Sequence, residues 1–279
     1  MHFSLSRPEK ILLAFCAALI VAAVFGPHVA QPAHYHAFAD QRTLIGIPCA
    51  LDVLSNLPFA LFGLLGFAWL RRLPAAAIGS SQRTMAALFF AGLLVTAAAS
   101  SYYHWQPDNA GLTIDRAGML VAFAGLLGLG AGGRISERAG NALAAAILLL
   151  GAVSVVLWSI SGNLLPWALL QGGGMVLVLG FAAIKPRDGA LAVRWAAVIG
   201  VYALAKLMEL GDAQAFAASG EWVSGHTLKH LAASLAAWPV LRALKSAAIS
   251  GQNRSTTGAG SAGRPGGLPS RFITHKAFS

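Results

Sequence analysis

The sequence predicts an all-α, polytopic membrane protein with eight membrane-spanning segments, and two observations lead to this fold class. Hydrophobic residues make up 57% of the 279 residues and charged residues only 11%, whereas a soluble domain carries about a quarter charged residues. The apolar residues also form blocks of about 20 residues, the length at which a helix crosses the hydrocarbon core of a bilayer. A helical membrane bundle is therefore the expected architecture.

The first predicted span, 10–30, is an apolar run that follows Arg7 and Lys10. A basic start and an apolar centre are also typical of a signal peptide. Cleavage after Gly26 would place Pro27 directly downstream, so we favour a retained membrane anchor.

Seven further apolar runs follow, and each is separated from the next by a short polar connection. The predicted spans are 51–70, 84–105, 112–131, 141–160, 164–184, 192–211 and 222–245. Every second connection is basic, and these connections contain Arg71, Arg72, Arg83, Arg134, Arg138, Lys185, Arg187 and Arg194. The opposite connections contain Asp40, Asp108, Asp212 and Glu221, with only Arg42 and Arg116 as cations.

This alternation of charge predicts the orientation of the chain. Loops on the cytoplasmic side of a membrane carry the excess of Lys and Arg, so both termini are expected in the cytoplasm and the acidic loops outside, as in a bacterial inner membrane. The net charge of +10 is thereby explained without a basic face, and no nucleic-acid partner is expected.

The same pattern divides the chain into three regions. Residues 1–50 form an N-terminal membrane anchor and outer loop, and residues 51–248 form a seven-helix membrane domain. Residues 249–279 are rich in Gly and Ser and are basic, which predicts a disordered cytoplasmic tail. Cys16 lies in the first span and Cys49 just before the second, and no disulfide between them is expected.

Polar residues gather at one depth of the predicted bundle. Ser100 and His104 lie at the outer end of the span 84–105, and Asp115 lies one turn into the next span. His226 and His230 lie where the last span enters from outside. Residues four apart share a helix face, about 6 Å apart along the axis. Because ionisable groups inside a membrane are costly and usually functional, the sequence predicts one site here.

The residue types indicate a metal site. Three neutral histidines leave a fourth position for water, which is the arrangement of catalytic zinc. We therefore predict Zn²⁺ held by His104, His226 and His230, with Asp115 as a partner of a ligand or as a proton acceptor. Haem with His104 and one histidine of the pair as axial ligands is an alternative, but it does not explain the nearby serine and aspartate.

These motifs resemble those of a known family. SSYYHWQPDNAGLTID (100–115) and HTLKH (226–230) are similar to the motifs of the alkaline ceramidase family within the CREST superfamily of integral-membrane hydrolases. DVLSNLPFALFG (52–63), with Ser55 and Asn56, is similar to the first core helix of that family. The resemblance implies a bacterial member with a seven-transmembrane CREST-type helical bundle and one extra N-terminal helix.

The resemblance also implies an activity. It implies a zinc-dependent hydrolase that cleaves the amide bond of ceramide or a similar N-acyl lipid to a free fatty acid and an amine. Zn²⁺ would be held by the three histidines, with Asp115 and Ser100 as catalytic residues on the periplasmic side. The lipid substrate would enter from the bilayer. The acidic cluster that binds calcium in animal members is not matched here, so calcium is not expected.

Two alternatives have other functions. One is a receptor-like or sensory seven-helix membrane protein in which zinc is structural. The other is a transporter, which the sequence favours less because it shows neither paired halves nor broken helices near the midplane. Among the remaining polar residues, Lys206 and Glu209 are expected to pair, and Lys229 is expected to extend to the outer interface.

Overall fold

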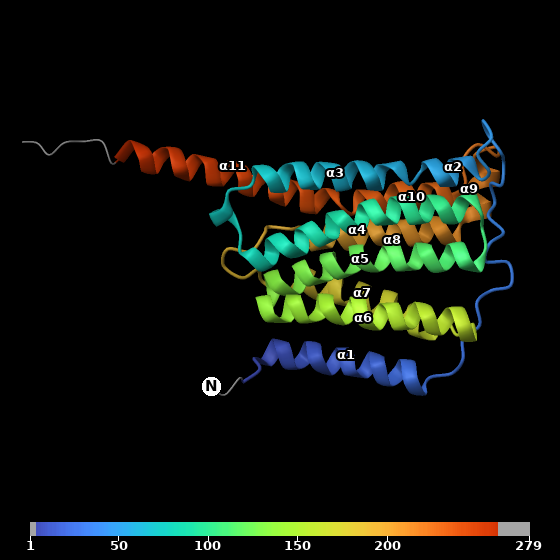
Figure 1. Ribbon diagram of the computed structural model, residues 1–279, viewed down its shortest axis with the longest axis horizontal. Coiled ribbons are helices and arrows are strands. Elements are labelled where there is room, and N and C mark those ends of the chain that lie inside the picture. Colours follow the sequence, from blue (N-terminus) through green and yellow to red (C-terminus); the bar gives the residue numbers. More distant parts are fainter. Residues whose placement is uncertain (1–3, 262–279) are drawn as a thin grey trace, which may run out of the picture.

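The computed structural model describes residues 4–261, with side chains described as far as residue 250. Within that range the chain is all-helical and contains no β-strand, only two isolated bridges. Most of the helices run side by side along one long axis (Figure 1). The elements are α1 Arg7–Phe25, α2 Ala50–Leu54, α3 Leu57–Arg72, η1 Ala75–Ala77, α4 Ser80–Trp105, α5 Asn109–Arg134, α6 Glu137–Ser161, α7 Leu165–Ala183, α8 Trp195–Leu210, α9 Asp212–Ala218, α10 Gly225–Leu235 and α11 Trp238–Ser261.

Within residues 4–261, six helical segments are long and apolar enough to cross a membrane: α1, α2 together with α3, and α4 to α7. The sequence predicts eight spans. The predicted span 192–211 corresponds to α8, which has only 16 residues. The predicted span 222–245 is divided into α10 and α11, because Pro239 in the first turn of α11 has no N–H for a helical hydrogen bond to the preceding turn.

The predicted tail begins later than expected in the described residues. Helix α11 continues to Ser261, past residue 249 where the sequence predicts disorder. Extending an existing helix costs less than starting a new one, and no proline lies between Pro239, in the first turn of α11, and Pro265. The rest of the predicted tail, residues 262–279, lies outside the described residues.

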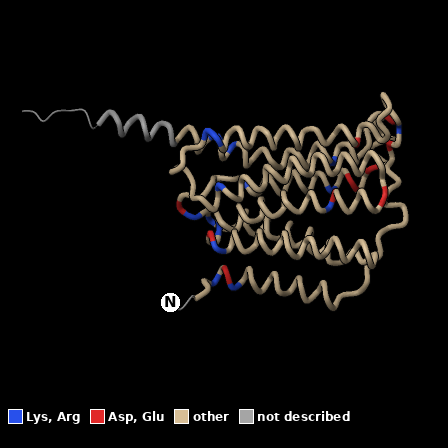
Figure 2. The backbone as a smooth tube through the Cα atoms, in the orientation of Figure 1, with Lys and Arg blue, Asp and Glu red and all other residues tan. Residues whose placement is uncertain are grey.

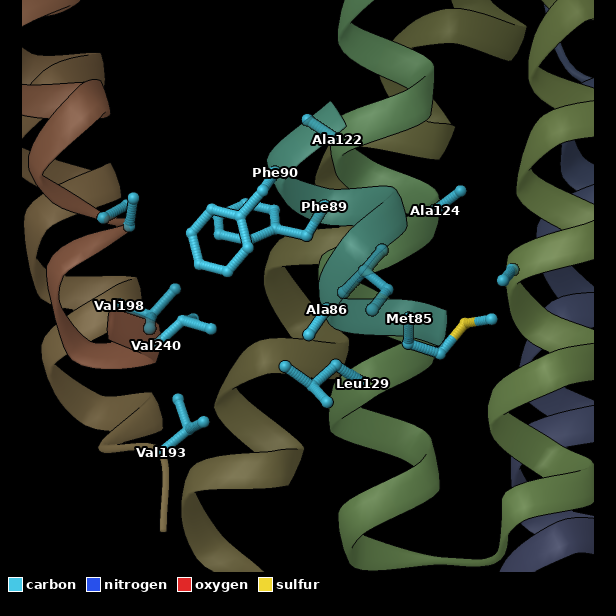
Figure 3. Close-up of a cluster of buried hydrophobic side chains, with 14 of the residues drawn as sticks. Met85, Ala86, Phe89, Phe90, Ala122, Ala124, Leu129, Val193, Val198 and Val240 are labelled. Atoms are coloured by element: carbon cyan, nitrogen blue, oxygen red, sulfur yellow. The ribbon is translucent and has the colours of Figure 1, made fainter. Parts of the chain in front are cut away.

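Small residues allow the central helices to pack closely. Added side chains at Gly92 and Gly125 would collide with the backbones of Ala122 and Phe89, respectively, so α4 and α5 approach nearly backbone to backbone. Small residues at helix interfaces are the usual means of close packing in membranes. Figure 3 shows Phe89 and Phe90 of α4 in the buried cluster that α8 and α11 complete with Val198 and Val240.

Charges are distributed unevenly along the bundle (Figure 2). The starts of α1, α4 and α6 and the ends of α3, α5 and α7 lie at one end, together with most of the Lys and Arg residues. The end of α4, the start of α5 and α10 lie at the other end. The basic connections of the sequence therefore come together in space, as their alternation predicts.

Helix α1 lies at the edge of the bundle and packs on α7. Its first turn is tied to α6, because Glu9 accepts hydrogen bonds from Ser136 Oγ at 2.6 Å and Arg138 Nη2 at 2.8 Å. Residues 26–49 then cross the opposite end of the bundle to reach α2 (Figure 1). Cys16 and Cys49 are both free in the structure.

Candidate metal centre

Three histidines from two distant parts of the chain meet at the end of the bundle opposite the basic connections. His104 lies in the last turn of α4, and His226 and His230 share one face of α10. Their ring centroids are 4.8, 4.8 and 4.9 Å apart. All three are buried, with exposed fractions of 1%, 8% and 4%. The predicted histidine cluster is therefore present.

This cluster could bind a metal ion. One nitrogen from each ring lies within 4.8 Å of the others, and no other group of this kind occurs among the described residues. Tetrahedral zinc with Zn–N bonds of about 2.0–2.1 Å places ligand nitrogens about 3.3–3.4 Å apart, so the rings need to close by about 1.5 Å at most. Nδ1 of His104 is buried without a hydrogen-bond partner. A buried nitrogen left unpaired is costly, and an ion bound through Nδ1 would satisfy it.

The serine that follows the last residue of α2 orients His230. Ser55 Oγ donates a hydrogen bond to the carbonyl oxygen of Asp52 at 3.0 Å and lies 2.8 Å from His230 Nδ1. Because a hydroxyl has a single hydrogen, it accepts from an Nδ1–H of His230. The proton on Nδ1 leaves the lone pair of Nε2 free for an ion, the role that such partners have at metal sites. Sequence analysis noted Ser55 only as part of a motif.

The start of α10 is held in place by two carboxylates, of which Asp52 is buried and Asp212 is half-buried. Asp52, with an exposed fraction of 0%, accepts from Thr227 Oγ1 at 2.6 Å and from Ser224 Oγ at 3.2 Å. Asp212 accepts from the backbone N–H of His226 at 2.8 Å. Neither carboxylate was predicted to belong to this site. A carboxylate within an apolar segment indicates a function. Asp52 lies in such a segment, so the sequence could have identified it.

Close packing fixes the position of α10 further. Gly225, the first residue of this helix, lies against the backbones of Met208 in α8 and Asp212 in α9, where no side chain would fit. His226 is the next residue. The glycine therefore lets the metal-site helix approach its neighbours at the point where the ligands begin.

Lys229 differs from the prediction. It does not extend to the outer interface: its Nζ donates to Glu209 Oε1 at 3.1 Å and to His226 Nε2 at 2.8 Å. Glu209 also accepts from Lys206 at 2.6 Å, which confirms the predicted pair. The positions of Glu209 and His226 explain the inward direction of Lys229, since both offer acceptors within its reach. Binding an ion through Nε2 of His226 requires Lys229 to turn fully to Glu209.

The segment 26–49 covers the histidines from outside. The ring centroid of Phe38 lies 4.6 Å from the ring centroid of His104 and 4.5 Å from the ring centroid of His226. This segment is tied down by His36, which bonds to Tyr103 Oη and Asn109 Oδ1, both at 2.9 Å. His36 therefore has a structural role that sequence analysis did not assign.

A cavity adjoins the histidines. Its empty volume is about 1040 Å³ when the open space at its mouth is included. His230, Ser100 and Asp115 line it, and Oδ1 of Asp115 is buried without a partner. Charged residues and many apolar residues line the cavity, and the apolar ones from α4 and α5 are Phe89, Leu93, Leu112, Met119, Ala122, Phe123 and Leu126. The predicted catalytic pair thus shares a space with one predicted ligand.

Comparison of the sequence with models of protein families and with curated proteins finds no match. The geometry by itself shows a bundle of membrane-type helices with three buried histidines that could bind a metal ion.

Proposed function

We propose that the protein is a zinc-dependent membrane hydrolase of the alkaline ceramidase type that cleaves the amide bond of an N-acyl lipid. The observation that supports this function best is the position of the histidine cluster beside a cavity that contains Asp115 and Ser100. A structural zinc site needs four protein ligands, whereas the described residues bring three histidines together.

The proposed membrane arrangement adds two spans to the six candidates. Helix α8 would form the seventh span and α10 with α11 the eighth, so that a seven-helix CREST-type bundle follows α1. We propose that the end rich in Lys and Arg faces the cytoplasm of a bacterium, because positive residues are enriched on that side of membranes. Both termini would then be cytoplasmic, and the histidines would lie toward the periplasm.

The chain's own residues would perform the following steps. His104, His226 and His230 would hold the ion, which when bound lowers the pKa of a water molecule and polarises a carbonyl. The carboxylate of Asp115 would take a proton from the attacking water and return it to the nitrogen of the leaving amine. The hydroxyl of Ser100 would donate a hydrogen bond to the carbonyl oxygen as it gains negative charge.

The cavity supports a lipid substrate. The apolar residues that line much of it would accept an acyl chain, and the polar residues near His230 would lie beside the amide. A substrate that reaches this cavity from the bilayer brings its acyl chain without first crossing water. Ceramide and other N-acyl lipids share this combination of an acyl chain and a polar amide.

An assay on the purified protein in lipid nanodiscs tests this function. We expect release of free fatty acid from a fluorescent ceramide or another N-acyl lipid, loss of release with a zinc chelator, and recovery when zinc is added back. The variant Asp115→Asn should keep its zinc but lose turnover by about 10²–10⁴-fold, the contribution of a general acid–base residue.

The matched control is Asp108→Asn, because Asp108 caps α5 through Gly111 N and does not line the cavity. It should retain turnover. A zinc-loaded protein that cleaves no N-acyl lipid would contradict the hydrolase and favour a receptor-like protein with the same site. Equal turnover in Asp115→Asn and the wild type would remove Asp115 from the mechanism.

A further inference from the structure

Arg116 is a buried cation whose charge the described residues leave largely unmatched. Its side chain is only 2% exposed, one residue after Asp115 on α5. The guanidinium Cζ lies 3.9 Å from the ring centroid of Trp158 and 5.5 Å from that of Trp167. Nη2 donates to Gln31 Oε1 at 3.0 Å. The aromatic rings thus hold the guanidinium in one orientation.

Two nitrogens of Arg116 have no acceptor within hydrogen-bonding geometry in the described residues. Nε and Nη1 are buried without a hydrogen-bond partner, and no ion pair includes Arg116 in residues 4–250. Burying a charge is expensive unless it is paired and hydrogen-bonded. The aromatic faces compensate only part of that cost, since a cation–π contact contributes about 0.5–2 kcal/mol.

Arg116 lines the same cavity as Asp115 and His230. Two other cations, Lys206 and Lys229, line it as well, but both donate to Glu209. Among these cations, Arg116 is the one that forms no ion pair with a carboxylate in the described residues. A ligand in the cavity would be bordered by both Arg116 and the proposed catalytic carboxylate of Asp115.

We propose that Arg116 binds an anionic oxygen group on the polar end of the lipid substrate, so that the substrate class is an N-acyl lipid with a carboxylate or phosphate headgroup. Guanidinium groups are suited to both anions because their donors are planar and always charged. The description as a substrate rests on the proposed hydrolase function, whereas the binding of the anionic lipid by Arg116 does not.

A binding experiment separates the binding of an anionic lipid by Arg116 from its hydrolysis as a substrate. The full-length, zinc-loaded protein in nanodiscs of neutral lipid is titrated with N-oleoylglycine, which carries a carboxylate, and with the neutral N-oleoylethanolamine of similar size. Phosphorylated N-oleoylethanolamine tests the phosphate headgroup. The temperature is kept low, and mass spectrometry verifies that each probe remains intact.

We expect the wild type to bind at least one of the two anionic lipids about tenfold more tightly than the neutral one, as one charge-assisted hydrogen bond of about 1.4 kcal/mol would produce. In Arg116→Gln the preference should disappear, and in Arg116→Lys it should be partly restored. The control Arg134→Gln, at the other end of α5 and outside this cavity, should keep the full preference.

The wild-type comparison decides the proposal even if Arg116→Gln fails to fold. Equal affinity for the neutral and both anionic lipids would overturn it, as would an unchanged preference in a folded Arg116→Gln. Displacement of the anionic probes by inorganic phosphate at equal concentration would show that free anions bind here and would overturn the headgroup assignment. A selective preference for an anionic lipid that is never hydrolysed would support this inference and reject the proposed enzyme.

Discussion

Ser55→Ala removes one hydroxyl and tests whether the orientation of His230 matters for metal binding. Ser55 Oγ is 2.8 Å from His230 Nδ1, and both residues are buried. Without the hydroxyl, Nδ1–H loses its acceptor, and the ring is free to rotate and to place its proton on Nε2. Loss of such a partner lowers metal affinity about 10–100-fold, which corresponds to about 1.4–2.8 kcal/mol of binding free energy.

The assay is a competition between the purified protein and a chromogenic zinc chelator, from which the dissociation constants of the wild type and the variant are obtained. The matched control is Ser234→Ala. Ser234 is also buried and lies one turn after His230 on α10, but its hydroxyl donates only to the Leu231 carbonyl. Zinc affinity in Ser55→Ala equal to that of the control would refute the proposed orientation of His230.

Three further predictions concern the site and its supports. His104→Ala removes one of three ligands and should reduce bound zinc, measured by elemental analysis, to well below one ion per protein; full zinc content would exclude His104 as a ligand. Gly225→Val should displace α10 by its collision with the neighbouring backbone and lower both Tm and zinc content, whereas Gly200→Val, on α8 where nothing lies within 4 Å, should not; equal effects would contradict the packing argument. Burial raises the pKa of Asp40, but hydrogen bonds from Arg42 outweigh burial and hold that pKa below its usual value. The stabilisation by Asp40 should therefore be present above the unfolded pKa of about 3.9 and fade as pH falls below it. When Tm is measured against pH, it should decline less at acid pH in Asp40→Asn than in the wild type. Parallel Tm curves for the two proteins would refute this stabilisation.

Much of the membrane architecture could be predicted because it depends on local composition. Blocks of about 20 apolar residues specify membrane helices wherever they occur, and six of the predicted segments are helices of that kind in the described residues. The two remaining predicted segments differ for a local reason as well. One is a shorter helix, and the other is interrupted before Pro239.

The residues of the candidate site could be predicted for a similar reason. Spacings of four residues place Ser100 with His104, and His226 with His230, on single helix faces. Alternating crossings then bring these faces to one end of the bundle, where the three histidines meet. Lys229 could not be placed in this way, because its direction depends on Glu209, an acceptor on another helix.

By itself, the sequence determined which segments are apolar helices, which end of the bundle collects the positive charge, and which histidines lie at the other end. Only the tertiary structure decided the partners: Ser55 on His230, Phe38 against the histidine rings, and the aromatic rings around Arg116. Periodicity and hydropathy describe one segment at a time. A hydrogen bond or stacking contact between residues more than 40 positions apart depends on how the helices and loops pack. This packing cannot be predicted from the composition of any single segment.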